Sequence, residues 1–366
     1  MQADFLIVGA GFAGITLAER ISSCLNRTVL IVERRTHIGG NSFDFYNEDG
    51  ILVQKYGPHI FHTDSELVWS YLSQFTEWNV YSHRVLAHVS DKEVYLPINL
   101  VTMEQLYGRT FTSESLQAFF DSRRIACPNV QNAGDVIVSQ VGEELYELFF
   151  KNYTKKQWGV YPDQLSPQVT RRLPIRLNRD TRYFSDKYQG LPKNGYTRMF
   201  ERMLSQPNIR ILLNTDYRDV CDQIDSQWVI LTGPIDYYFD YRFGKLPYRS
   251  LRFEFVTLDK EWFQDAGVVN YPNDYEYIRI TEFKHLYCQR HHRTTICYEY
   301  PSDEGDPYYP VPSDANQDLY ERYAREAEKL AHTRFTGRLG TYQYLNMDQV
   351  VAQSLSLFEQ IGKDHV

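Results

Sequence analysis

A glycine-rich turn near the start of the chain has the residue types and spacing to bind the pyrophosphate of a dinucleotide. Residues 9–14 read Gly-Ala-Gly-Phe-Ala-Gly and directly follow an apolar run, residues 5–8. In a dinucleotide-binding βαβ unit, Gly9 permits the tight turn, Gly11 lets a pyrophosphate approach the backbone, and Gly14 lets the helix pack closely on the strand. The N-terminus of that helix offers unpaired N–H groups to the phosphates. The motif therefore predicts a dinucleotide site.

An acidic residue and a second glycine turn narrow the choice of dinucleotide. Glu33 ends the next apolar run, 28–32, about 20 residues after the glycine motif, where a carboxylate can bind ribose hydroxyls. This fingerprint alone does not separate NAD from FAD. Arg34, Gly40 and Asn41 follow it, and they resemble the continuation found in FAD-binding proteins of the glutathione-reductase type. We therefore expect FAD.

Two histidines lie three residues apart, beside a glycine–proline pair. His59 and His62 could be metal ligands, but no nearby cysteine or carboxylate pair supplies a third ligand, so we expect no metal. Two other interpretations stay open. The histidines could be ordinary residues of a turn, or their loop could pack on the isoalloxazine ring of a flavin.

A stretch of aromatic and polar residues could form a pocket for a nucleotide base. In a helix, Phe150, Tyr153 or Thr154, and Trp158 would share one face, with Phe149 beside them. An apolar core stripe is the usual explanation of such spacing. The polar atoms of Tyr153 and Thr154 favour the base pocket instead.

Two arginines could neutralise a diphosphate. Arg172 lies in a segment rich in proline and arginine, 161–180, and Arg279 lies in a distant strand-like stretch. Single arginines are usually solvated, but two that converge from separate elements bind oxyanions in bidentate fashion. Near the C-terminus, the glycine turn 337–340 precedes a helix whose positive end could stabilise an anionic reduced flavin.

The elements that must position these residues indicate an α/β fold, with a Rossmann-like FAD-binding domain, an inserted helical domain and an antiparallel β-sheet domain. Helical periodicity dominates from about 100 to 160, and residues 161–180 favour a loop over a packed element. Strand signals from about 228 to 300, beginning with WVILTG, imply the antiparallel sheet. The expected bounds are 1–80 with about 188–231 and 312–366 for FAD binding, about 98–187 for the helical domain with a mobile loop at 161–178, and about 81–97 with 232–311 for the sheet domain.

Composition limits the possible partners. The 366 residues are 43% hydrophobic and 23% charged, as in soluble globular proteins, and their number suggests two or three domains. The net charge of −8 argues against a general binder of nucleic acid or anionic membranes, so an anionic substrate would need local arginines. No segment approaches the ~18 unbroken apolar residues of a membrane span. Five scattered cysteines without CxxC spacing, and no signal peptide, predict a reduced cytoplasmic protein.

Taken together, the motifs resemble those of the bacterial UDP-galactopyranose mutase family along nearly the whole chain. The stretches that carry the resemblance, in this order, are GPHIFHT (57–63), KNYTKKQWG (151–159), GLPKNGYTRMF (190–200), ITEFKH (280–285), YYPVP (308–312) and GRLGTYQYLNMD (337–348). The resemblance implies an isomerase that interconverts UDP-galactopyranose and UDP-galactofuranose without net redox change. It implies that N5 of reduced FAD is the nucleophile, that the reductant is external, with NAD(P)H expected, and that the protein is a homodimer.

The resemblance also implies roles for individual residues. The uracil and ribose would be held by Phe149, Phe150, Tyr153, Thr154 and Trp158. The diphosphate would be clamped by Arg172 and Arg279 and would accept hydrogen bonds from Tyr183, Tyr309 and Tyr344, while Asn270 would contact the sugar. The residues beside the flavin would be His59, His62, Arg338, Gly340, Tyr344 and Met347. The catalytic group would comprise Arg172, Arg279, His62 and Arg338.

One position departs from the family pattern. The family usually reads YLDMD where residues 344–348 read YLNMD, so Asn346 replaces a carboxylate near the substrate. Asparagine keeps the shape and one acceptor but loses the charge and gains a donor. UDP-N-acetylgalactosamine, UDP-arabinose and a dTDP-deoxysugar therefore stay open as substrates. More distant alternatives are a flavin oxidase of the amine-oxidase type and a catalytically inactive nucleotide-sugar-binding protein.

Overall fold

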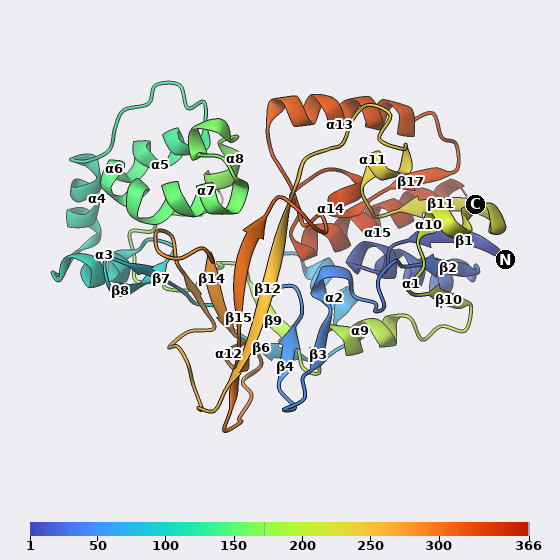
Figure 1. The fold of residues 1–366 in the computed structure, drawn as a ribbon, viewed down its shortest axis with the longest axis horizontal. Coiled ribbons are helices and arrows are strands. Elements are labelled where there is room, and N and C mark those ends of the chain that lie inside the picture. Colours follow the sequence, from blue (N-terminus) through green and yellow to red (C-terminus); the bar gives the residue numbers. More distant parts are fainter. Residues whose placement is uncertain (172, 365–366) are drawn as a thin grey trace.

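A five-stranded parallel sheet forms around the glycine turn, on the right of Figure 1. The computed structural model describes residues 1–171 and 173–364. The strands, in spatial order, are β10 (Ile209–Leu212), β2 (Val29–Val32), β1 (Gln2–Val8), β11 (Asp225–Leu231) and β17 (Thr333–Phe335). The helices α1 (Phe12–Leu25) and α15 (Met347–Asp364) pack against each other and share an apolar core with β1 and β2. The predicted Rossmann-like unit is therefore confirmed.

β11 separates two expectations for residues 228–231. The strand pattern places them in the stretch that implies the antiparallel sheet, whereas the expected bounds place them in the FAD-binding domain. β11 pairs in parallel with β1 and with β17, so only the inference from the strand pattern is wrong here. A short, buried apolar strand has the same sequence pattern in either kind of sheet.

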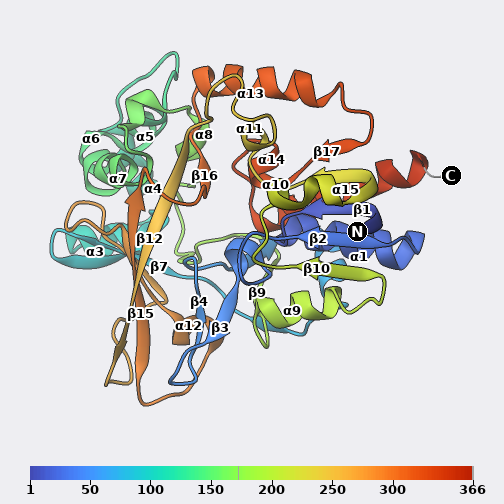
Figure 2. The same ribbon diagram turned by 45° about the vertical axis from the view of Figure 1, so that its right-hand side comes forward.

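A seven-stranded sheet lies between the parallel sheet and a group of helices, as both views show (Figures 1 and 2). Its strands, in spatial order, are β16 (Tyr309–Pro310), β12 (Tyr248–Leu258), β15 (Thr294–Ser302), β14 (Arg279–Glu282), β13 (Val268–Asn270), β7 (Val85–Val89) and β8 (Lys92–Leu96). Neighbouring strands are antiparallel except β13 and β7, which are parallel. The expected sheet is thus present with one parallel pair.

The helical group packs around its own apolar core, which includes Met103, Leu116, Phe120 and Ile137. Its elements are α3 (Leu100–Tyr107), α4 (Ser113–Asp121), α5 (Ala133–Val141), α6 (Glu143–Tyr146), a π-helical turn (Glu147–Lys151), α7 (Asn152–Trp158), a 3-10 turn (Pro162–Gln164) and α8 (Gln168–Arg171). Capping boxes begin α3, α4 and α5 and satisfy N–H groups that have no partner within the helix.

The segment before Arg172 is a packed element, so the loop predicted from its prolines is wrong there. Ala133 N–H donates to the carbonyl oxygen of Leu165 at 2.9 Å. Thr170, which is 3% exposed, donates its hydroxyl to the carbonyl oxygen of Ala133 at 2.8 Å. These bonds fix the segment on the N-terminal end of α5, and such long-range partners leave no trace in local composition.

Smaller elements complete the fold. A three-stranded sheet contains β5 (Phe61–Thr63), β9 (Tyr188–Pro192) and β6 (Trp78–Val80), and a hairpin contains β3 (Asp44–Tyr46) and β4 (Leu52–Gln54). The remaining helices are α2 (Glu66–Leu72), α9 (Tyr196–Met203), α10 (Tyr217–Val220), α11 (Ile235–Tyr238), α12 (Phe283–Tyr287), α13 (Asp314–Ala327) and α14 (Gly337–Gly340), with 3-10 turns at Gly40–Ser42 and Cys221–Gln223. Within the described residues, no helix has the length and apolar character to cross a membrane.

Candidate functional site

A cavity of about 580 Å³ opens at the glycine turn. Most residues predicted to bind the cofactor line it: Gly9, Gly11, Glu33, Arg34, Gly40, Asn41, His59, Arg338 and Met347. Gly14, Gly340 and Tyr344 are not among its lining residues. The structure thus gathers nine residues that are spread over almost the whole sequence around one cavity.

Close backbone packing explains the glycines of the turn. A Cβ on Gly9 would lie 2.1 Å from Thr232 Oγ1, and a Cβ on Gly14 would lie 2.0 Å from the carbonyl oxygen of Gly9. A Cβ on Gly40 would lie 2.9 Å from the Cα of Gly11, so the two glycine turns touch each other. Side chains here would push the two turns and their neighbours apart and so deform this end of the cavity.

Glu33 fixes the same turn from the end of β2. Its Oε2 accepts from the Ala10 N–H and its Oε1 from the Arg35 N–H, both at 2.8 Å. Arg34 and Arg35 then form ion pairs with Asp306 at 2.7 and 3.0 Å. The carboxylate retains acceptor capacity for ribose hydroxyls, and the bound arginines form one wall of the cavity.

His59 is held as a neutral imidazole on this wall. Its Nδ1 lies 2.9 Å from the carbonyl oxygen of Gly57, and its backbone N–H and carbonyl both bind the Gln54 amide, at 2.6 and 3.0 Å. Burial lowers the pKa of His59 to about 4. Among the described residues, no group of three or more His, Cys, Asp or Glu side chains is arranged to hold a metal ion.

His62 belongs to a second cluster, away from the cavity lining. Its Nδ1 lies 3.2 Å from Asp186 Oδ2, and its ring stacks on Phe184 with 3.7 Å between centroids. His83, which we did not predict, lies beside Phe184 and is 4% exposed. Burial, together with the nearby charge of Arg279, lowers the pKa of His83 to about 3.

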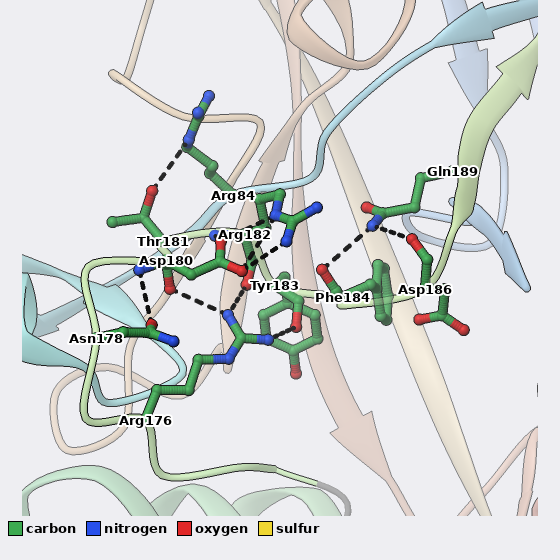
Figure 3. Close-up of polar contacts among 10 residues, drawn as sticks. All are labelled: Arg84, Arg176, Asn178, Asp180, Thr181, Arg182, Tyr183, Phe184, Asp186 and Gln189. Carbon is green, nitrogen blue, oxygen red and sulfur yellow. Dashed lines mark hydrogen bonds and ion pairs between the residues drawn. The ribbon is translucent and has the colours of Figure 1, made fainter. Parts of the chain in front are cut away.

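Tyr183, the residue before Phe184, lies in a loop that several hydrogen bonds hold in place, shown in Figure 3. The Arg176 guanidinium donates to the carbonyl oxygens of Asp180 at 3.1 Å, of Tyr183 at 3.5 Å and of Arg182. Tyr183 N–H donates to the carbonyl oxygen of His83 at 2.7 Å. Arg176 therefore fixes the backbone of a residue that the resemblance assigns to the diphosphate.

Arg279 lies in the centre of the seven-stranded sheet, opposite Asn270 of β13 and Glu299 of β15. Its Nη2 donates to the Tyr153 hydroxyl at 2.6 Å, and its Nε lies 3.6 Å from Glu299 Oε2. Burial lowers the pKa of Arg279, but Tyr153 and Glu299 raise it to a net value above its ordinary one, so the guanidinium keeps its charge. Asn270 is 7% exposed and its Oδ1 has no partner among the described residues, as expected of an atom that binds a ligand.

The aromatic stretch 149–158 is not one regular helix. Phe149 and Phe150 lie in a π-helical turn, and both pack in the apolar core of the helical group. π-Turns are rare and frequently occur at functional sites. The change of register places Thr154 and Trp158 among the buried residues of α7, while Tyr153 reaches Arg279.

An aromatic cluster joins α7 to the cavity. Trp158 lies 6.3 Å from Tyr309 and 6.1 Å from Tyr344, whose rings stack at 5.4 Å. The guanidinium of Arg338 lies 5.3 and 5.0 Å from the two tyrosine ring centres, and it donates to the carbonyl oxygen of Leu345. Arg338 also lines the cavity, so it borders both the predicted cofactor site and the predicted nucleotide site.

Asn346 precedes the first residue of α15. Its N–H donates to Gln349 Oε1 at 2.8 Å, and its carbonyl accepts from the Val350 N–H at 3.0 Å. Its side chain is partly exposed. Arg172 lies outside the described residues, so its predicted convergence with Arg279 stays a prediction.

Glu299 and His83 could not be recognised from the sequence. Each lies in an ordinary strand or connecting segment, and each acquires its environment from strands that pair over long distances. A search for acidic residues in register with Arg279 could have found Glu299, but the register itself was unknown.

Comparisons with known proteins agree with this geometry. A family model described as UDP-galactopyranose mutase matches residues 148–344, and one described as an NAD(P)-binding Rossmann-like domain matches residues 7–75. A probable UDP-galactopyranose mutase of Klebsiella pneumoniae is 39% identical to this chain, and the alignment covers 98% of this chain and 94% of that relative. A dTDP-fucopyranose mutase of Escherichia coli is 36% identical, with 96% of each chain covered. A crystal structure of a reduced UDP-galactopyranose mutase has a TM-score of 0.81 at 17% identity, covering 99% and 96% of the two chains, and so shares the fold.

Proposed function

Because the chain belongs to the UDP-galactopyranose mutase family and is an isomerase of nucleotide-linked pyranoses, we propose that it interconverts UDP-galactopyranose and UDP-galactofuranose with FAD as its cofactor. The observation that carries the proposal is the position of Arg338, which lines the dinucleotide cavity and lies over Tyr309 and Tyr344. A sugar attached to a diphosphate at the aromatic cluster would then face the flavin end of the cavity.

Both the protein backbone and the side chains that line the cavity suit a dinucleotide. Gly9, Gly11 and Gly40 leave the space for a pyrophosphate, and Glu33 is placed for the ribose. His59 and Met347 would border the ring system. Reduced flavin, when bound, supplies a nucleophilic nitrogen, N5, and this agrees with the lack of an evident nucleophile in the protein.

The protein's own groups would bind and orient the nucleotide sugar. Arg279 is a permanent cation with free donors, so it can neutralise the diphosphate as it becomes a leaving group. Tyr153 and Trp158 would hold the uridine, and Asn270 offers its unpartnered amide oxygen to a sugar hydroxyl. The stacked rings of Tyr309 and Tyr344 would exclude water from the anomeric carbon.

Activity that depends on the redox state tests the proposal. The purified protein should be yellow, and after reduction with dithionite it should convert UDP-galactofuranose into the pyranose form, as followed by chromatography. The oxidised protein is the matched control. Equal turnover by the oxidised and reduced protein would contradict the proposed role of the flavin.

Arg172 offers a second test of the diphosphate site. We expect Arg172→Ala to abolish nearly all turnover and to leave the flavin bound, because the resemblance places this residue on the diphosphate and away from the cofactor. Near-normal turnover of the variant would remove Arg172 from the mechanism.

A dTDP-linked deoxysugar is the second candidate substrate. The relative named dTDP-fucopyranose mutase is almost as similar to this chain as the probable UDP-galactopyranose mutase, at 36% and 39% identity. Asn346 adds to this possibility, because it replaces a carboxylate of the family pattern near the substrate. Comparing the turnover of the two nucleotide sugars by the same reduced preparation decides which is the better substrate. We further propose that an external reductant, NAD(P)H, maintains the flavin and that the enzyme is a homodimer.

A further inference from the structure

Arg249 lies where two elements of the predicted nucleotide site meet. It belongs to β12, pairs in register with Tyr309 of β16, and has a side chain that is 6% exposed. Its Nε donates to the carbonyl oxygen of Gln157 at 2.9 Å, and its Nη2 donates to that of Lys156 at 3.2 Å. Both carbonyl groups belong to the last turn of α7. The guanidinium therefore holds the end of α7 against β12, and the backbone of β12 pairs with β16.

These bonds complete the C-terminal end of α7. The last carbonyl groups of a helix have no partner within the helix, and a cation beside them is stabilised by the helix dipole. Gly159 ends the helix at φ 77°, and a Cβ there would lie only 3.0 Å from Arg249 Nη1. The planar guanidinium can serve two carbonyl groups in fixed geometry, which a lysine ammonium on a flexible chain does less well.

A second contact holds Arg249 from the side of the cofactor cavity. Asp303 forms an ion pair with it and lies in residues 303–308, which connect β15 to β16. The same segment lines the cavity, and Asp306 fixes it to Arg34 and Arg35. The end of α7 is thus connected through Arg249 to a segment that is itself fixed at the end of β2.

We propose that Arg249, held by Asp303, is a positioning residue for nucleotide binding: it fixes the end of α7 against β16 and so sets the spacing between Trp158 and Tyr309. The two rings lie 6.3 Å apart, and they would contact the nucleotide from α7 and from β16. In this role Arg249 acts through α7 and β16 and not on the substrate. The inference rests on the proposed function, because it takes α7 to carry the base pocket.

The test compares two methionine variants of the same strand. In the holoprotein, Arg249→Met should weaken UDP binding about tenfold in isothermal titration calorimetry, because it removes a buried charge that is bonded to two carbonyl groups. Arg252→Met is the matched control, since Arg252 is exposed on β12 and stacks on Tyr300. We expect its UDP dissociation constant to stay within about twofold of the wild type, because exposed ion pairs contribute little.

Two further measurements separate positioning from a general loss of folding. Arg249→Met should raise KM and leave kcat of the flavin-loaded fraction near that of the wild type, whereas partial unfolding lowers only the amount of active protein. Asp303→Asn, a change at an exposed carboxylate, should keep the fold and weaken UDP binding by about twofold to fivefold. Arg249→Lys should not restore wild-type affinity.

The outcomes distinguish a failure of this inference from a failure of the proposed function on which it rests. If the wild type binds no UDP, the proposed function and the inference both fail. If the wild type binds UDP, and Arg249→Met and Asp303→Asn bind it as tightly as Arg252→Met does, the inference alone is overturned.

Discussion

Replacing Arg279 with methionine should destabilise the protein as well as remove a ligand for the diphosphate. Arg279 is the cation beside Glu299, with Nε 3.6 Å from Oε2, and the Glu299 side chain is only 2% exposed. The other carboxylate oxygen accepts from the Thr281 hydroxyl at 3.2 Å, which carries no charge. The variant therefore leaves a carboxylate buried without its opposite charge.

The size of the effect follows from the buried carboxylate of Glu299. Burial raises the pKa of Glu299, and the charge of Arg279 opposes that rise. Without Arg279 the pKa should rise further, because nothing then offsets the cost of burying the ionised form. Removing one partner of a buried ion pair costs about 3–5 kcal/mol, and we expect a loss of this size at pH 7.

Urea unfolding between pH 5 and pH 8 measures this cost. A carboxyl whose pKa is raised in the folded state stabilises the fold below its ordinary pKa and loses that contribution as the pH rises toward the raised value. The free energy of unfolding of Arg279→Met should therefore fall with pH more steeply than that of the wild type. Arg279→Met with Glu299→Gln should recover most of the stability and show no added slope, yet it should not recover UDP binding. Parallel pH curves for the wild type and the single variant would refute the reasoning.

Two other predictions follow from the cavity and its surroundings. Because burial lowers the pKa of His83 to about 3, the unfolded chain binds a proton that the folded chain lacks, and stability should be lost as the pH falls from about 6.5 toward 3. His83→Phe should reduce this loss relative to the wild type in urea unfolding, whereas unchanged acid sensitivity would contradict the shift. Gly14→Ala should yield protein without bound flavin, because its Cβ would lie 2.0 Å from the carbonyl oxygen of Gly9. Gly362→Ala, whose Cβ would meet nothing within 4 Å, should keep the ordinary ratio of flavin to protein absorbance.

The dinucleotide unit could be predicted from sequence because its constraints are local. The glycine spacing, the apolar strand before it and Glu33 all report on one turn and the two strands beside it. The structure then shows why those glycines cannot carry a side chain, through contacts such as that of Gly40 with Gly11. Because the local geometry restricts which residues fit, those residues in turn predict the local geometry.

The surroundings of Arg279 could not be predicted, because strand pairing over long distances creates them. Glu299 faces Arg279 only because β14 and β15 pair in one register, and a shift by one residue would turn Glu299 to the opposite face of the sheet. The π-helical turn before α7 likewise departs from the regular helical spacing on which the predicted face of Phe150 rests. The packing of 162–171 on α5 depends on two hydrogen bonds between distant residues.

The charges of the site indicate how a protein with a net charge of −8 would bind the proposed diphosphate. The positive charge there belongs to arginine, since Arg279 keeps its proton at any physiological pH. The imidazoles of His59 and His83 are held neutral by burial, so they neither add to that charge nor change it above about pH 5. Glu299 partly offsets the charge of Arg279 from the neighbouring strand on the same face of the sheet, and its side chain is buried. A Rossmann-like domain is therefore combined here with a constant local cation, Arg279, which the proposed diphosphate leaving group would require and a simple hydride transfer would not.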